Sequence, residues 1–538
     1  MKKLALVALA TAQFVMVLDQ SVMNVSISQL VHDFDTTVPT IQAVITLYCL
    51  VMAMLMLTGG KIGDIIGRRR AFVIGLVIYA VGSATTAAAP TVAVLALGWS
   101  ILEGIGAALV LPALAALIAG NFEGPQRKVA YAVIGGVAGA GIAVGPILGG
   151  WATTELTWRV VFVGEVVLVG IILLLTPKLD DALREGPEPK LDVIGSVLSA
   201  AGIGAVVLGI LQSSTWGFVE PKESPVEPFG FSLTPFVIVG GGVLLWAFVV
   251  WQRRREAQGR DPLVHLSLFR VPPLRAGLVG LFTQNLVLMG VFFVVPLYLQ
   301  LVIGLDALET GVRMLPISIT MFICSALGSR LSARFPVRTI VRTGLLTSVA
   351  AIVLLLDTID PQLDGRGFAV SMAVLGIGMG LIVSQLGNVV QSSVDSSGRG
   401  EAGGLQYTGQ QLGSSVGVAL IGALVLAGLT TVFVHTVLAD DRIAPDVAQQ
   451  VSTAAANGVD FVDADQIGEA ARSAGLDDAA ADAVVDDYEQ AQLRALKAGL
   501  LATGVLALIA LASTRHLPAE VPPPEEGYPT AEVAAGAT

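Results

Sequence analysis

Long apolar runs alternate with short polar loops along almost the whole chain. A helix that crosses a bilayer needs about 20 apolar residues, and about fourteen runs meet this requirement. The pattern therefore predicts an all-α polytopic membrane protein. The predicted spans are 4–28, 40–60, 71–89, 92–119, 129–152, 159–176, 191–211, 233–252, 275–302, 310–328, 340–357, 366–390, 403–433 and 492–513.

The first run also resembles the start of a signal peptide, because it begins with two lysines and contains an Ala-x-Ala pattern ending at Ala12. Its apolar character continues beyond Val17. That length suits a first transmembrane helix better than a cleaved leader.

Composition agrees with a membrane protein. Of the 538 residues, 54% are hydrophobic and 14% are charged, whereas soluble domains carry about 25% charged residues. Cys49 and Cys324 both fall in apolar runs, so no disulfide framework is indicated. The four histidines have no metal-ligand spacing, and we expect no metal site and no cofactor.

Basic residues gather in alternate loops and in the first residues of the chain. Cytoplasmic loops of membrane proteins are enriched in Lys and Arg, so both termini should be cytoplasmic. High Ala and Gly content, with Arg in excess of Lys, suggests a GC-rich bacterium and hence a bacterial cytoplasmic membrane.

The acidic charge is concentrated in one segment. Residues 440–490 contain thirteen acidic residues and two basic ones, a net charge of −11, so the remainder of the chain is neutral. This balance argues against nucleic-acid binding. Segment 434–490 should lie outside the cell, either as a solvated helical hairpin or as a lid or partner-docking hairpin. The tail 516–538 should be disordered.

The chain contains an internal echo. Gly104-Ile-Gly-Ala-Ala-Leu109 in the fourth span is matched by Gly376-Ile-Gly-Met-Gly-Leu381 in the twelfth. The fifth and thirteenth spans are both rich in glycine. The pattern predicts an N-terminal six-helix bundle (1–176), two additional helices with their loops (177–274) and a C-terminal six-helix bundle (275–515), the layout of many secondary transporters.

A polar turn follows the second span and reads Gly60-Lys-Ile-Gly-Asp64-Ile-Ile-Gly67-Arg68-Arg69-Arg70. Asp64 can pair with the arginines or with the positive N-terminus of a facing helix. Such a pair would form a cytoplasmic gate that breaks when the halves rock. The alternative is a set of positive-inside anchors.

This turn resembles motif A of the major facilitator superfamily, although Ile65 stands where Arg or Lys is usual. The residues Gly141, Gly145, Pro146, Gly149 and Gly150 resemble that family's antiporter motif C. Leu18-Asp19-Gln-Ser-Val-Met-Asn24 is similar to the first-span motif of the fourteen-span drug:proton antiporter branch. The resemblance implies the major facilitator fold, with two extra central helices, and proton-driven drug export.

Two family motifs are altered. Ser100-Ile-Leu-Glu103-Gly104 lacks the membrane arginine of motif B and has Glu103 in place of its glutamine, and Glu165 replaces an asparagine that the branch usually shows. Asp19, Glu103 and Glu165 are therefore candidate proton-coupling residues, because burial disfavours a charged carboxylate and lets it exchange protons. Glu165 should lie nearer the outer interface. Arg159 should be an interface anchor or a partner of Glu165 or Glu155.

The second half offers amides instead of acids. These side chains can bind polar groups of a substrate, or they can form interhelical hydrogen bonds. The candidate substrate-cavity residues are Asn24, Ser100, Gln284, Asn285, Gln385, Asn388, Gln406, Gln410 and Gln411.

We therefore expect a monomeric antiporter that exports lipophilic cations or neutral amphiphiles by alternating access, with protons and membrane lipids as its other partners. Two alternatives remain: an exporter of a lipid or endogenous metabolite to the cell envelope, and a non-transporting membrane sensor or scaffold. No nucleophile–base constellation or phosphate loop indicates an enzyme.

Overall fold

The computed structural model describes residues 2–122, 124–180, 190–222, 224–394, 399–455 and 459–520. Among these residues, thirteen helices are long and apolar enough to cross a membrane. A further helix, α7, occupies the position of the fifth predicted span. The described residues form helices and loops without a β-strand. The predicted all-α membrane architecture is confirmed.

Among the described residues, six long helical segments precede an additional pair, and six follow it. The first set comprises α1 (Lys2–Val25), α3 (Val38–Ile66), α4 (Arg68–Ala87), α5 (Val92–Leu95) continued by η1 (Ala96–Glu103) and α6 (Gly104–Asn121), α7 (Gly124–Trp151) and α8 (Arg159–Leu175). The pair is α9 (Val193–Trp216) and α10 (Leu233–Ala257). The second set comprises α11 (Pro272–Leu297) with η6 (Tyr298–Val302), α12 (Ala307–Leu331), α13 (Val337–Thr358), α14 (Gly365–Ser392), α15 (Arg399–Ala439) and α18 (Asp478–Ala510).

Short helices complete the chain. They are α2 (Ile27–Asp33), η2 (Ala152–Leu156), η3 (Thr176–Lys178), η4 (Pro228–Gly230), η5 (Leu266–Arg270), α16 (Pro445–Ala455), α17 (Ala464–Ser473) and η7 (Ser513–His516). Of these and the longer helices, η1, η2 and η6 have π-helical turns. Such turns are rare in proteins as a whole, and many of those that occur lie at functional sites.

Many helices begin at a side chain that caps them. The Asp306 carboxylate accepts the Glu309 N–H, and the Glu309 side chain accepts the Asp306 N–H, which is a complete capping box for α12. Asp192, Asp364 and Asp477 cap α9, α14 and α18 in a similar way. Polar residues at the ends of apolar runs thus satisfy helix donors that lipid cannot satisfy.

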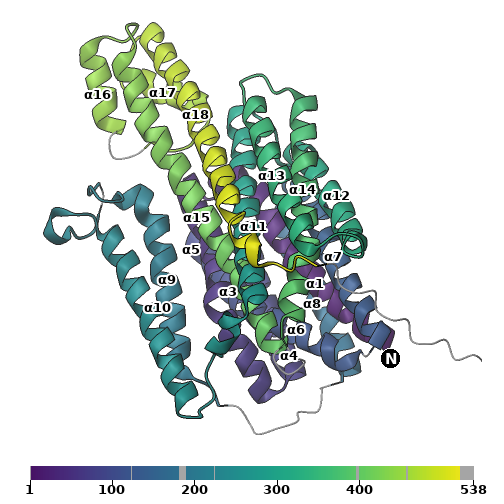
Figure 1. Cartoon of the computed structure of the whole chain (residues 1–538). Coiled ribbons are helices and arrows are strands. Elements are labelled where there is room, and N and C mark those ends of the chain that lie inside the picture. Colours follow the sequence, from purple (N-terminus) through teal and green to yellow (C-terminus); the bar gives the residue numbers. More distant parts are fainter. Residues whose placement is uncertain are drawn as a thin grey trace, which may run out of the picture.

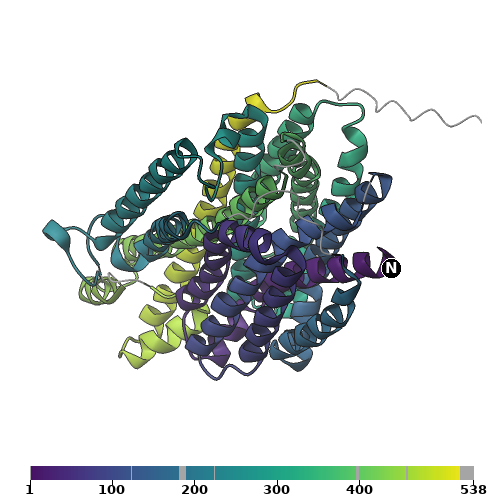
Figure 2. The ribbon, with the colours of Figure 1, turned by 90° about the horizontal axis from the view of Figure 1, so that it is seen from below.

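Two seams join the first set of helices to the second. In one, α7 packs against α12. Gly150 of α7 lies close to Ala307 of α12, and Gly311 of α12 lies close to Pro146 of α7. In the other, α3 packs against α15: Gln42 Nε2 donates to the Val418 carbonyl at 3.0 Å. The helices α9 and α10 form a pair at the edge of the bundle, where α9 contacts α3 and α15 (Figures 1 and 2).

The acidic segment folds into two short helices between α15 and α18. We call α16 and α17 with their connections the hairpin, and the end of the bundle that carries it the hairpin face (Figure 1). Because α3 and α15 run antiparallel, Asp64 lies at the opposite end, the Asp64 face. The last span starts at Asp478 rather than at 492, since the end of the hairpin and the span form one helix. Of the tail 516–538, residues 521–538 lie outside the described residues.

Candidate functional site

Three carboxylic acids meet inside the first set of helices. Asp19 comes from α1, Glu103 from the end of η1 and Glu165 from α8. Their side chains are fully buried, with at most 1% of each residue exposed. One carboxylate oxygen from each lies within 4.8 Å of the other two. We call these three residues the acid cluster.

Each acid accepts one or more hydrogen bonds from neutral side chains. Trp99 Nε1 donates to Asp19 Oδ1 at 2.8 Å, and Thr86 Oγ1 donates to Glu103 Oε1 at 3.1 Å. Glu165 Oε2 accepts from the Tyr79 hydroxyl and from Ser83 Oγ, both at 3.1 Å. One of these donors, Trp99, belongs to η1, and the other three belong to α4.

The remaining carboxylate oxygens are left unpaired. Asp19 Oδ2, Glu103 Oε2 and Glu165 Oε1 are buried without a hydrogen-bond partner, as is the Tyr48 hydroxyl. The Tyr48 ring stacks on Trp99 at 4.7 Å between centroids. No ion pair to any of the three acids occurs among the residues that the structure describes. The cluster thus consists of acceptors that need protons or a cation.

Electrostatics favours partial protonation of the acid cluster. Two charges 4.8 Å apart repel by about 3 kcal/mol at an effective dielectric constant of about 20. Burial adds a desolvation cost for every carboxylate that stays charged. The three carboxylate oxygens could also hold a hard cation, which prefers oxygen ligands. The expectation of no metal site was based on the spacing of the histidines and stays a prediction.

Close backbone contacts place Glu103 against α4. A Cβ on Gly82 would lie 2.6 Å from Glu103 Cγ, and one on Gly98 would lie 2.6 Å from Thr86 Oγ1. Small residues let transmembrane helices approach closely. The π-helical turn of η1 ends at Glu103 and carries Trp99 and Ser100 toward α1 and α3. Glycines and an irregular helix together bring the acids into contact.

Three separate hydrogen bonds connect sequence neighbours of the acid cluster and helix α3 to their packing partners, including α15 of the second half. Ser100 Oγ, next to Trp99, donates to the Val44 carbonyl of α3 at 2.7 Å. Ser415 Oγ of α15 donates to the Thr46 carbonyl, which also belongs to α3, at 3.2 Å. Gln20, next to Asp19, donates to Gln411 of α15 at 3.2 Å. Movement at the acids can therefore reach the α3–α15 seam.

The predicted gate motif forms the turn between α3 and α4. Gly67 has a φ of 99°, which residues with a Cβ rarely adopt. Arg68 Nη2 lies 3.5 Å from Asp64 Oδ1, one of the two pairings expected for Asp64. Gly60 faces Pro112 of α6, and Arg69 is half-buried at the start of α4.

The predicted antiporter motif lines both sides of α7. A Cβ added to Gly141 would lie 3.1 Å from Val17 of α1, and one added to Gly149 would lie 2.9 Å from Val22 of the same helix. Gly145 lies against Ser21. Pro146 and Gly150 contact α12 instead. The motif thus connects α1 to the α7–α12 seam. Its role in antiport is a prediction.

The predicted substrate-cavity residues do not form one set. Ser100 and Gln385 donate to backbone carbonyls, of Val44 and Gly328, and are fully buried. Asn24 and Asn285 each donate to a carbonyl one turn earlier in their own helix. Gln284 Oε1 is buried without a partner.

The other candidates face the seam or the surface. Gln411 accepts from Gln20 across the two halves, and Gln406 accepts from Gln391 at 3.5 Å. Gln410 is half-buried and Asn388 is exposed. Of the amides, Gln411 and Gln284 are the best placed to respond to a change in the acid cluster or to a ligand.

The structure sharpens two sequence-based expectations. Glu165 is fully buried and belongs to the acid cluster, and its position relative to the membrane interface stays a prediction. Of the two roles expected for Arg159, pairing with Glu165 or Glu155 is not found: its guanidinium donates to the Ala87 and Ala89 carbonyls and lies over Trp158. The role of an interface anchor stays a prediction. Cations are favourable at the C-terminus of a helix, here α4.

The sequence interpretation also missed the donors of the acid cluster. Tyr79, Ser83 and Thr86 are spaced by four and three residues in an apolar span, and this spacing places them on one helix face. A polar stripe of this kind was the available signal. The aromatic residues Tyr48 and Trp99 carried no comparable signal.

Comparisons with known proteins agree with this architecture. The family model of the Major Facilitator Superfamily matches residues 9–418. The chain is 29% identical to the tetracenomycin C resistance and export protein of Streptomyces glaucescens, over 80% of this chain and 77% of that protein. It is 31% identical to the puromycin resistance protein of Streptomyces alboniger, over 82% and 84% of the two chains.

A further relative is the multidrug efflux pump LfrA of Mycolicibacterium smegmatis, 28% identical over 79% of this chain and 81% of that protein. Among solved structures, a bacterial homologue of the human lysosomal transporter Spinster, in its inward-facing and unoccupied conformation, superposes with a TM-score of 0.61. It shares 14% identity and covers 96% of this chain and 97% of its own, so it supports the fold alone. On the family match and the helical architecture, this chain belongs to the major facilitator superfamily.

Proposed function

We propose that the chain exports lipophilic small molecules, cationic or neutral and amphiphilic, in exchange for protons. The acid cluster is the proton site of this proposal. The observation that carries it is the presence of three fully buried carboxyl groups within 4.8 Å of one another, with no described ion pair to neutralise them. Export as the direction of transport is supported by the relatives named for antibiotic or multidrug resistance.

The proposed cycle follows from the neighbours of the acid cluster. When the cluster gains a proton from outside, the repulsion between its members falls, and Asp19 weakens its hold on Trp99. Because Trp99 and Ser100 belong to the same π-helical turn, a shift there reaches Val44 of α3 and then the α3–α15 seam. Loss of the proton to the cytoplasm restores the first state.

The negative first half supports a preference for cations or neutral molecules. A substrate cation and a proton would compete for the same negative charge, so that binding of one releases the other. We place the chain in a bacterial cytoplasmic membrane as a monomer. The distribution of basic residues supports an orientation with both termini inside. With this orientation, the hairpin lies on the side to which substrate is released.

The test uses purified protein in liposomes with an imposed pH gradient and ethidium as a fluorescent lipophilic cation. Wild-type protein should move the dye only while the gradient lasts, and Asp19→Asn should abolish gradient-driven movement. Asp441→Asn, which neutralises an exposed acid of the hairpin, is the matched control and should behave as wild type. Dye movement that is independent of both the gradient and Asp19 would overturn the proposal.

A second candidate function is export of a lipid or endogenous metabolite toward the cell envelope. One observation favours it: the hairpin is a packed unit, in which Phe461 is buried and the Tyr488 hydroxyl donates to the Asp460 carbonyl at 2.7 Å. Deletion of 440–485 discriminates the two functions. A drug exporter should keep most of its dye transport, whereas an envelope exporter should lose its activity. Substrate-stimulated proton flux would exclude a non-transporting sensor.

A further inference from the structure

The segment that follows the additional helix pair contacts both halves of the protein. We call residues 261–266 the strap. Asp261 Oδ2 lies 3.6 Å from Lys61 Nζ, at the end of α3 in the first half. The His265 backbone N–H and ring Nδ1 donate to Glu401, near the start of α15 in the second half, the ring contact being 2.9 Å. The strap therefore joins the two helices of one seam at the Asp64 face.

The strap is anchored to α10 by its own backbone. Gln252 Oε1 accepts the N–H groups of Leu263 and Val264, at 2.8 and 3.4 Å. Glu256 Oε1 accepts the Leu266 N–H at 2.6 Å. Leu263 and Val264 are themselves buried. A displacement of α10 must consequently displace the strap.

The same network fixes α10 to α9. The Asp192 carboxylate, which is 1% exposed, accepts from Trp251 Nε1 at 2.9 Å and from Gln252 Nε2 at 2.8 Å. Asp192 is also the N-cap of α9, and Arg255 Nε lies 3.6 Å from it. The pair and the strap thus form one hydrogen-bonded unit.

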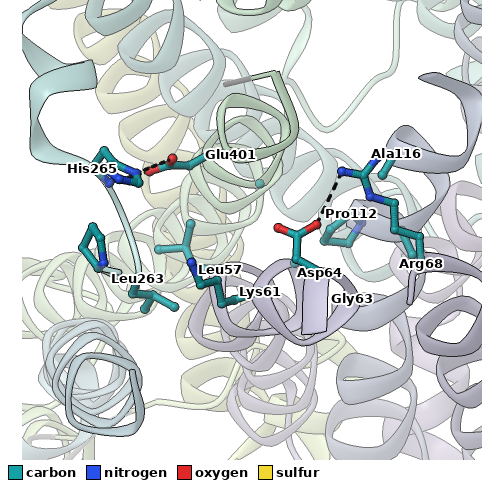
Figure 3. A pocket seen from close by; sticks show the side chains of 14 residues that line it. Leu57, Lys61, Gly63, Asp64, Arg68, Pro112, Ala116, Leu263, His265 and Glu401 are labelled. Carbon is teal, nitrogen blue, oxygen red and sulfur yellow. Dashed lines mark hydrogen bonds and ion pairs between the residues drawn. The ribbon is translucent and has the colours of Figure 1, made fainter. Parts of the chain in front are cut away.

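The strap lies beside the predicted gate motif. A cleft of about 70 Å³ is lined by Asp64, Arg68, His265 and Glu401, among others. Figure 3 shows Asp64 and Arg68 on one side of it and His265 and Glu401 on the other. Lys61 lies between these two sides. Deeper in the seam, α3 and α15 are joined by Ser415 and Thr46. The strap therefore spans the mouth of the seam at the place where the gate motif is located.

We propose that the strap holds the Asp64 ends of α3 and α15 together, and that α9 and α10 act on transport through it. Asp261, His265 and Glu401 are positioning residues in this proposal. Their contacts are partly exposed, with the Asp261 side chain 48% and the Glu401 side chain 23% accessible. Exposed ion pairs are weak, which suits contacts that open and close in every cycle. The proposal rests on the proposed alternating-access transport.

The experiment measures the separation of the two halves without substrate or proton gradient. Nitroxide labels are placed at Arg70 on α4 and Ser392 on α14, both exposed, in a background that carries Cys49→Ser and Cys324→Ser. The distance distribution between the labels is recorded by pulsed electron resonance in lipid nanodiscs. Glu401→Gln and Gln252→Leu should each raise the ratio of the longer-distance population to the shorter roughly threefold to tenfold. Arg254→Gln, an exposed neighbour on α10, should leave it unchanged.

A charge exchange guards against simple misfolding. Lys61→Asp should raise the same ratio, and the double variant Lys61→Asp with Asp261→Lys should restore the parent distribution. Unchanged distributions in Glu401→Gln and Lys61→Asp would overturn the proposal, as would a double variant no closer to the parent than Lys61→Asp. Because no transport is measured, a protein that fails to export dye would overturn the proposed function and leave this test intact.

Discussion

The two halves share a backbone arrangement but differ in the chemistry built on it. A Cβ on Gly106 would lie 2.7 Å from both the Gly75 carbonyl oxygen and the Tyr79 nitrogen. In the second half, a Cβ on Gly378 would lie 2.7 Å from the Gly344 oxygen and 2.8 Å from the Ser348 nitrogen. The seam between α4 and α6 is thus repeated between α13 and α14, and Tyr79 corresponds to Ser348.

The correspondence extends to the acids. A Cβ on Gly149 would lie 2.9 Å from the Val22 Cα, and one on Gly417 would lie 3.0 Å from the Leu286 Cα. Val22 thus corresponds to Leu286, and three residues earlier Asp19 corresponds to Thr283. By the register of Gly104 with Gly376, Glu103 corresponds to Leu375, and by the register of Tyr79 with Ser348, Ser83 corresponds to Ile352.

The equivalent groups of the second half are satisfied locally or are apolar. The Thr283 and Ser348 hydroxyls donate to backbone carbonyls of their own helices at 2.9 Å, and Leu375 and Ile352 are buried. At these equivalent positions the first half therefore carries titratable groups and the second half carries hydroxyls or apolar side chains. The contrast supports the proposal that proton exchange occurs in the first half and that the second half responds through the seams.

The largest effect should come from neutralising an acid of the cluster, measured against removal of a hydroxyl at a second-half position that corresponds to one of the acids. Glu103→Gln keeps the shape of the side chain but removes its proton exchange, and should lower gradient-driven dye transport on the order of 10²-fold. Thr283→Val, at the position equivalent to Asp19, removes one local hydrogen bond worth about 0.6 kcal/mol and should change transport by about threefold or less. Both are measured in liposomes at equal protein content. Equal losses in the two variants would contradict the division of roles.

A second prediction separates the shared backbone from the chemistry. Gly82→Ala places a methyl group 2.6 Å from Glu103 Cγ, and Gly378→Ala places one against Ser348. Each should reduce stability by about 1–3 kcal/mol, because overpacking forces neighbours to move. Only Gly82→Ala should also change the pH dependence of dye transport per folded molecule. Thermal unfolding and transport profiles measure the two effects, with Gly164→Ala, which has open space around it, as the control.

The sequence predicted the helices well because apolar length alone determines where a span can lie. The π-helical turn of η1 could not be predicted in this way, since apolar length does not distinguish helix types. In the structure this turn contains Gly98, which packs closely against α4. Among the acids, Asp19 was identified from its resemblance to a first-span motif of the family, and Glu103 from its place in the altered motif B. Their convergence depends on which helix faces turn toward each other, and periodicity does not determine that.

Glu165 shows the limit of judging burial from sequence. It lies only six residues after Arg159, about 9 Å into α8 at 1.5 Å per residue. Sequence position therefore suggested the interface. In the structure, Trp158 and Phe34 cover the start of α8, and α4 packs on the side that carries Glu165. Burial here comes from neighbouring helices, which a single sequence does not place.

The smallest effect on transport should come from the hairpin, where the second half concentrates its charge. Arg442 bridges Asp440 and Asp486, at 2.8 and 2.6 Å, and this guanidinium lowers the pKa of Asp440 below its usual range. The stabilisation from this pair is therefore present above the unfolded pKa of Asp440 and is lost as the pH falls through the lowered value.

Arg442→Gln should increase cleavage of the hairpin by added protease at neutral pH. Acidification should narrow the difference in cleavage rate between this variant and wild type. Dye transport should stay at the wild-type level, because these charges lie at the hairpin and do not belong to the acid cluster, which is formed by α1, η1 and α8. A transport loss in Arg442→Gln comparable to that of Glu103→Gln would place coupling charge in the second half and end the distinction between the two halves.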